Sequence, residues 1–243
     1  MLRQPVIPVR PSLAVFTGGT NTGSVTAKKI REQYRNNYWY LEYSLSLIRW
    51  RLQMKLCFNA GPEPMEEYFA FAHENGFPWM ELSCNNPNNF LNKWDSKRID
   101  NIKRLRDKYG LHYGLHSASF VNAAEIEPTV KVAAQQHLLD YMKLAHDLEA
   151  EYIVLHFGYH FSLFMEEVYR CLIDTYKPVV ELAEKFELPI GIENMNKMHK
   201  DCEVAYMGVY PEEFARVFEA IPSKYFGLTL DVAHANLLPD DTK

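Results

Sequence analysis

The residues best suited to chemistry lie at the ends of short apolar runs that are typical of strands. Four runs end in, or directly before, residues that can bind a metal ion: His116, His156, Glu193, and Asp231 with His234 three positions later. Carboxylate oxygens and imidazole nitrogens together suit Mn²⁺, Co²⁺ or Zn²⁺ better than the all-oxygen sites of Mg²⁺ or Ca²⁺. Because the carboxyl ends of parallel strands meet at one edge, these residues predict a divalent metal site.

Each of these residues also has a purely structural interpretation. His116 and His156 are compatible with hydrogen-bonded core histidines, and Glu193 with a carboxylate that pairs with a lysine. Asp231 is well placed to cap a helix. The convergence of five titratable residues from four equivalent strand ends favours a metal site over five independent structural roles.

Strand-like and helical patterns alternate from residue 54 onward, as expected for βα units around a parallel sheet. The predicted strands begin at Met54, Trp79, Leu111, Tyr152, Pro189 and Gly227. The predicted helices cover residues 64–75, 95–109, 128–148, 165–186 and 211–220. The third of these helices has one apolar face that is predicted to be core: Val130, Ala134, Leu138, Tyr141, Met142 and Ala145.

Six such units occupy residues 54–243, whereas a closed (β/α)₈ barrel typically needs about 250 residues. An open, doubly wound sheet is an alternative that can stop at six strands. Metal-binding residues that converge from four strands fit a barrel better. The sequence therefore predicts an α/β fold, a (β/α)₈ TIM barrel that is truncated after strand six.

Residues 1–53 differ in composition from the rest of the chain. Their first acidic residue is Glu32, and arginines and lysines precede it, a bias that resembles organelle transit peptides. Met54 is the first residue of a predicted strand, which is where a natural start codon is expected. We therefore predict an N-terminal extension over 1–53, either disordered or the result of a non-native start, and a TIM-barrel domain over 54–243.

The overall composition is that of an ordinary soluble globular protein, with 47% hydrophobic and 23% charged residues. A net charge of −5 makes nucleic acid an unlikely partner on electrostatic grounds. The four widely spaced cysteines predict reduced thiols in a cytoplasmic protein. No apolar stretch is long enough to predict a membrane span. Whether the chain forms a homo-oligomer is left open.

Several of these segments resemble the xylose-isomerase-like TIM barrels, a superfamily of sugar and sugar-phosphate isomerases and epimerases, related dehydratases and endonuclease IV. The resemblance covers residues 54–236 and rests on the sequence around His116, on His156-Phe-Gly, on Ile192-Glu-Asn, and on Leu230-Asp-Val-Ala-His-Ala-Asn. It implies that Glu193 and Asp231 bind a metal and that His234 is a ligand or a substrate contact. The family pattern also includes a histidine from strand seven and a glutamate from strand eight, beyond the six strands predicted here.

The resemblance implies a metal-dependent isomerase or epimerase of a small carbohydrate: a sugar, a sugar phosphate or a hydroxy-keto acid. A metal ion that holds two substrate oxygens would stabilise the enediolate formed when a carboxylate removes a proton. Glu193 is the candidate catalytic acid or base, and Glu81 and Asn194 are candidates for substrate binding. For Glu81, a solvated strand end is an equally good interpretation.

Two alternatives remain. An endonuclease IV-like hydrolase of abasic DNA, with several zinc ions, requires the same early ligands; the acidic net charge, the Glu193-Asn-Met-Asn segment and the lack of an arginine cluster at the strand ends count against it. The other is an inactive fragment, because six units leave two strand edges exposed. On this basis residues 54–243 alone are predicted to be poorly soluble or inactive.

Overall fold

The computed structural model describes residues 56–60 and 63–238. Within them, six strands form one sheet in the order β1-β2-β3-β4-β6-β8. These strands are β1 (Cys57–Asn59), β2 (Trp79–Ser83), β3 (His112–His116), β4 (Ile153–Leu155), β6 (Ile190–Glu193) and β8 (Phe226–Thr229). All neighbouring pairs are parallel. This succession confirms the predicted α/β fold with six consecutive strands of a TIM-type barrel.

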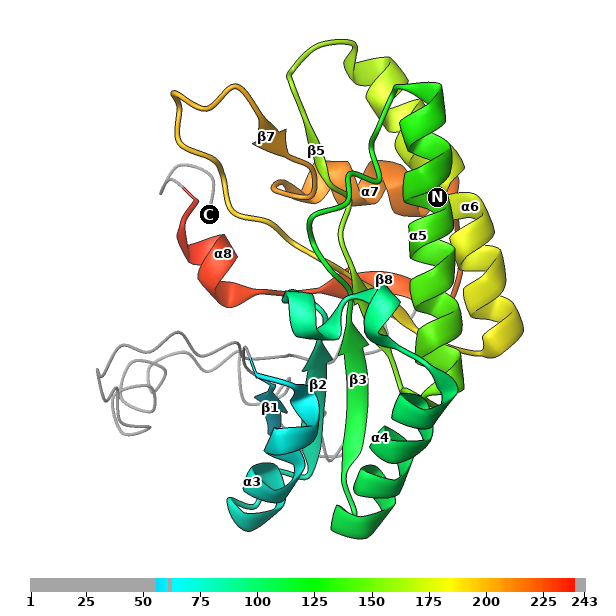
Figure 1. Cartoon of the computed structure of the whole chain (residues 1–243). Coiled ribbons are helices and arrows are strands. Elements are labelled where there is room, and N and C mark those ends of the chain that lie inside the picture. Colours follow the sequence, from blue (N-terminus) through cyan, green and yellow to red (C-terminus); the bar gives the residue numbers. More distant parts are fainter. Residues whose placement is uncertain (1–55, 61–62, 239–243) are drawn as a thin grey trace, which may run out of the picture. The chain divides into compact units, whose positions relative to one another are not determined.

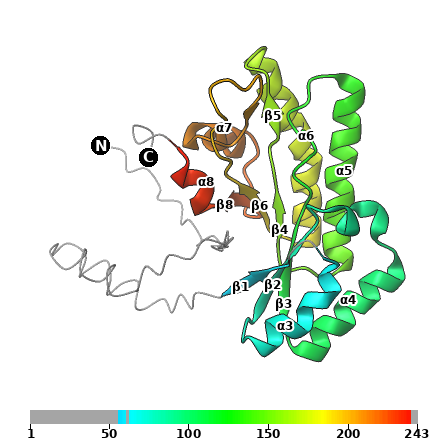
Figure 2. The ribbon, with the colours of Figure 1, turned by 60° about the vertical axis from the view of Figure 1, so that its left-hand side comes forward.

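Helices connect the strands and cover one face of the sheet. The longer ones are α4 (Ser96–Tyr109), α5 (Pro128–Asp147), α6 (Met165–Phe186) and α7 (Pro211–Ala220). Figures 1 and 2 show α4, α5 and α6 along the same side of the strands. Local chemistry sets the ends of α4: the Asp95 side chain accepts the amide of Arg98 at 2.8 Å, and Gly110 ends the helix with a φ of 62°.

Shorter helical segments complete the connections and include α3 (Tyr68–Glu74), α8 (Val232–Asn236), η2 (Pro87–Asn89) and η3 (Leu91–Lys93). The predicted helix over 64–75 begins as a 3₁₀ turn, η1 (Met65–Glu67), before α3. A two-stranded antiparallel sheet of β5 (Tyr159–His160) and β7 (Ala205–Tyr206) was not predicted. Strands of two residues are too short to give a periodic signal.

Side chains alternate along the strands between two surroundings. One set packs with the helices in the main core, and it includes Met80, Leu82, Leu115, Ile153, Leu155, Ile190 and Ile192. The other set faces the barrel interior, where Trp79, Tyr152 and Val154 form a separate apolar cluster. Period-two alternation places Glu81, His116 and Glu193 on this interior side. The strands therefore aim the predicted site residues away from the helix-packed core.

The predicted core face of α5 needs one correction. Ala134, Leu138, Tyr141, Met142 and Ala145 are buried, as expected. Val130 is 50% exposed because it lies in the first turn of the helix, where the Glu127 side chain caps its amide.

The predictions for residues 1–53, including the extension and its possible origins, lie outside the described residues. None of the helices in the described part of the chain is long and apolar enough to cross a membrane. All four cysteines fall within the described residues, and each is a free thiol.

Candidate metal centre

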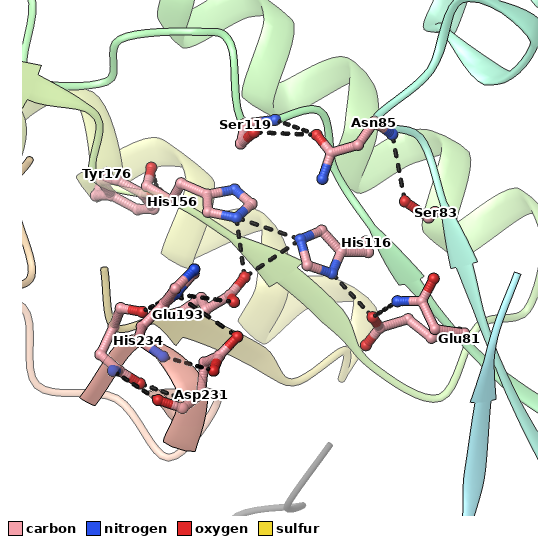
Figure 3. A network of polar contacts seen from close by, with 12 residues as sticks. Glu81, Ser83, Asn85, His116, Ser119, His156, Tyr176, Glu193, Asp231 and His234 are labelled. Carbon is pink, nitrogen blue, oxygen red and sulfur yellow. Dashed lines mark hydrogen bonds and ion pairs between the residues drawn. The ribbon is translucent and has the colours of Figure 1, made fainter. Parts of the chain in front are cut away.

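The structure brings the five predicted metal-site residues together (Figure 3). His116 is the last residue of β3, and Glu193 is the last residue of β6. His156 directly follows β4, Asp231 is the N-cap of α8, and His234 lies within that helix. Residues up to 118 positions apart along the chain thus meet at the carboxyl ends of neighbouring parallel strands.

The first donor group consists of His116, His156 and Glu193, all of them buried. The Nε2 atoms of the two histidines lie 3.2 Å apart. Oε2 of Glu193 is 3.1 Å from Nε2 of His156 and 3.3 Å from Nε2 of His116. Three potential ligand atoms therefore converge on one point.

The second donor group consists of Glu193, Asp231 and His234. Nδ1 of His234 lies 3.5 Å from Oε1 of Glu193 and 3.6 Å from Oδ2 of Asp231. Oδ1 of Asp231 caps α8, because it accepts the amides of Ala233 at 2.7 Å and His234 at 3.0 Å. The helix-cap interpretation of Asp231 thus holds together with its place in the cluster, and Glu193 belongs to both groups.

Asn194 holds the second group in place through the backbone. Its side-chain amide donates to the carbonyl of Asp231 at 3.0 Å, and its Oδ1 accepts the amide of Asp231 at 2.6 Å. The carbonyl of Asn194 accepts a hydrogen bond from Nδ1 of His234 at 2.8 Å. Asn194 is buried, and its side chain is engaged with the protein; a role in substrate binding stays a prediction.

Glu81 does not form a solvated strand end, because it is fully buried. Its Oε1 accepts from Nδ1 of His116 and from Nδ2 of Asn59, both at 2.9 Å. Its Oε2 accepts from the hydroxyl of Tyr152 at 3.5 Å. Sequence reasoning missed Asn59 and Tyr152, although both lie on the same alternating face as the site residues, and that alternation was the available signal.

The surroundings fix the charges of the first group. Burial alone would raise the pKa of Glu193, but hydrogen bonds with His116 and His156 hold it well below its usual range. Burial opposes the charged form of His116, yet Glu81 and Glu193 raise its pKa to about 10. Burial lowers the pKa of His156 despite the contact with Glu193. These surroundings therefore favour the charged form of His116, the neutral form of His156 and the ionised form of Glu193.

These donors fit a divalent metal. Facing imidazole nitrogens at 3.2 Å require a cation, a proton or a metal, between their lone pairs. The carboxylate of Glu193 compensates positive charge at the same point. Two imidazoles with a carboxylate form a donor set that suits Zn²⁺, Mn²⁺ or Co²⁺.

The sequence profile of the Xylose isomerase-like TIM barrel family matches residues 69–243. The chain belongs to this family. The match includes all five predicted metal-site residues, from His116 to His234. The predicted family resemblance is thereby confirmed.

Three relatives illustrate the similarity. A D-tagatose 3-epimerase-like protein of known structure is 27% identical, with a TM-score of 0.66 over 75% of this chain and 67% of the other. D-psicose 3-epimerase from Clostridium cellulolyticum H10 shares the fold at 15% identity, with a TM-score of 0.63 over 77% and 66% of the two chains. An uncharacterized protein of Methanocaldococcus jannaschii is 28% identical over 77% of this chain, which is 64% of its own length. The chain thus spans about two thirds of the length of these relatives.

Proposed function

We propose that the protein is a metal-dependent epimerase or isomerase of a small sugar, sugar phosphate or hydroxy-keto acid. The observation that carries the proposal is the group of Glu193, Asp231 and His234 at the ends of adjacent strands. The 27% identity to a D-tagatose 3-epimerase-like protein also supports the proposal. The combination of imidazole nitrogens with carboxylate oxygens favours Mn²⁺, Co²⁺ or Zn²⁺ as the cofactor.

Glu193 and Asp231 are the proposed anionic ligands, and His116 and His156 offer nitrogen donors beside Glu193. When bound, a divalent cation supplies Lewis-acid stabilisation of negative charge that develops on substrate oxygens. The low pKa of Glu193 keeps its carboxylate ionised, as a ligand must be. The same low pKa makes this carboxylate a weak proton acceptor, so its predicted role as base or acid stays a prediction.

His234 suits a substrate contact better than a ligand bound through Nδ1. Because a carbonyl oxygen only accepts hydrogen bonds, the 2.8 Å contact with the carbonyl of Asn194 places a proton on Nδ1 of His234. The remaining nitrogen, Nε2, is then available to a polar group of a substrate. The His234 side chain is 27% exposed, against 6–9% for the other four site residues. We therefore propose that the substrate approaches from the side of His234.

One observation favours the endonuclease alternative. The two donor groups share Glu193, and with His234 as a ligand they would hold two metal ions, as hydrolysis with several zinc ions requires. The net charge of −5 argues against strong binding to a phosphate backbone. The same donor set suits sugar isomerisation and phosphodiester hydrolysis, so an assay of the reaction has to distinguish the two functions.

Incubation in D₂O with Mn²⁺, Co²⁺ or Zn²⁺ and a ketose such as D-tagatose or D-psicose is expected to introduce deuterium at a carbon next to the carbonyl. In enediolate chemistry, the proton removed from that carbon exchanges with solvent deuterium. Phosphodiester hydrolysis leaves the C–H bonds of the sugar intact. Mass spectrometry of the recovered sugars measures the exchange. A parallel assay follows nicking of an abasic duplex.

The control variant is Glu151→Gln, which alters an exposed carboxylate paired with His112 at the opposite end of β3. It should exchange deuterium like the unmodified protein, whereas Glu193→Gln should not. Metal-dependent cleavage of the abasic duplex, without deuterium in any ketose or keto acid tested, would establish the hydrolase instead.

A further inference from the structure

Glu81 contacts neither solvent nor the cluster of donor atoms directly, yet it is tied to one of the proposed ligands. Its side chain has no exposed surface, which leaves no oxygen free for a substrate. Oε1 lies 2.9 Å from Nδ1 of His116. Glu81 and Glu193 therefore contact opposite sides of the imidazole ring (Figure 3). The carboxylate thus reaches the site only through His116.

This hydrogen bond determines which nitrogen of His116 is available. A carboxylate accepts, so Nδ1 of His116 donates and carries a proton. Nε2 then points towards Nε2 of His156 and Oε2 of Glu193, at 3.2 and 3.3 Å. A ring rotated about its bond to Cβ would lose the contact with Glu81 and turn Nε2 away from the group.

Three donors from three separate segments of the chain hold Glu81 itself. Besides His116 on β3, they are the side-chain amide of Asn59 on β1 and the hydroxyl of Tyr152, which precedes β4. Burial raises the pKa of Tyr152 far above its usual range, so its hydroxyl stays a donor. Gly114, which pairs with Glu81 in the β2–β3 register, leaves the space that the Tyr152 ring fills. A carboxylate with this many partners has a fixed orientation.

We propose that Glu81 is a positioning residue that fixes the ring of His116 and directs its Nε2 into the metal site. This inference rests on the proposed function, because it requires that His116 bind the metal. Hydrogen-bonded carboxylates behind histidine ligands orient the ring and increase its basicity, and their loss costs metal affinity. Glu81 would therefore act on affinity without touching metal or substrate.

Titration of the protein with Zn²⁺ alone, followed by calorimetry, tests the inference. Glu81→Ala is expected to weaken Zn²⁺ binding by about 10–100-fold. Glu81→Gln should lose less, because an amide oxygen still accepts from Nδ1 of His116. In the zinc-loaded, ¹⁵N-labelled protein, the Nδ1 proton of His116 should exchange slowly with water, shift in Glu81→Gln, and disappear in Glu81→Ala.

Two variants separate positioning from stability. Tyr152→Phe removes one donor to Glu81 and leaves His116 in contact, so its melting temperature should fall while its Zn²⁺ affinity stays close to that of the unmodified protein. Glu151→Gln should change neither quantity. If Glu81→Ala does not fold, Glu81→Gln decides by its affinity and its Nδ1 resonance.

Unchanged affinity in a folded Glu81 variant, with an unmodified protein that binds zinc, would overturn the positioning role and leave the proposed function standing. An unmodified protein that binds no zinc would overturn both.

Discussion

Glu193→Gln is expected to weaken metal binding by more than about 100-fold, beyond the loss typical for residues that only support ligands. Glu193 is the one residue common to the two donor groups. An amide oxygen lacks the negative charge that offsets a divalent cation in a buried site. Metal analysis of the dialysed protein measures the remaining stoichiometry.

Asp231→Asn provides the comparison, because it alters only the second group. Its loss of metal affinity should be smaller than that of Glu193→Gln if His116 and His156 contribute ligands. Circular dichroism would establish that each variant is folded. Full metal stoichiometry in a folded double variant, Glu193→Gln with Asp231→Asn, would show that the metal binds elsewhere.

Gly114→Ala is expected to lower the free energy of unfolding by about 1–3 kcal/mol, the usual cost of overpacking an interior. A Cβ atom at this position would lie 2.2 Å from Cζ of Tyr152, which is far shorter than a van der Waals contact. The ring would have to shift within its cluster with Trp79 and Val154, where its hydroxyl contacts Glu81. Chemical denaturation followed by circular dichroism measures the change.

Gly227→Ala is the matched control, since Gly227 is also a strand glycine on the interior face. A Cβ atom there would meet nothing within 4 Å. Its free energy of unfolding should change by less than about 0.5 kcal/mol, as for most substitutions without a packing conflict. Equal losses in both variants would indicate a general intolerance of side chains in these strands instead of a clash with Tyr152.

Much of the fold is predictable because it depends on local patterns. Runs such as Ile190–Glu193 combine apolar residues with a terminal acid, and both features survive in the structure as a buried strand with its carboxylate at the site. Caps such as Asp95 and Gly110 act within one helical turn. By contrast, β5 and β7 exist only because two loops meet, which no local pattern encodes.

That these residues lie together was predictable, but the contacts between them were not. Alternation indicates that Glu81 and His116 share the interior face, yet their contact joins residues 35 positions apart and depends on the register of β2 and β3. Tyr152 could not be connected to Glu81 without knowing that Gly114 leaves room for its ring. For Glu81, the structure excludes the alternative of a solvated strand end, because strand position alone does not report burial.

The roles of the individual site residues stay predictions for a chemical reason. Glu193, Asp231 and three histidines are suitable ligands for sugar isomerisation and for phosphodiester hydrolysis alike. The comparisons show the family and the fold, and neither of these identifies the reaction. The substrate is recognised by groups beyond the donor atoms, so the donor set alone does not select it.

The most direct test of the metal centre is an anomalous difference map from crystals of the protein soaked with Mn²⁺ or Zn²⁺. We expect a peak within coordination distance of the Glu193 carboxylate and of either Asp231 or the pair His116 and His156. A second peak on the other side of Glu193 is compatible with the place of this residue in both donor groups. Anomalous peaks confined to exposed histidines such as His199, with none beside Glu193, would contradict the account.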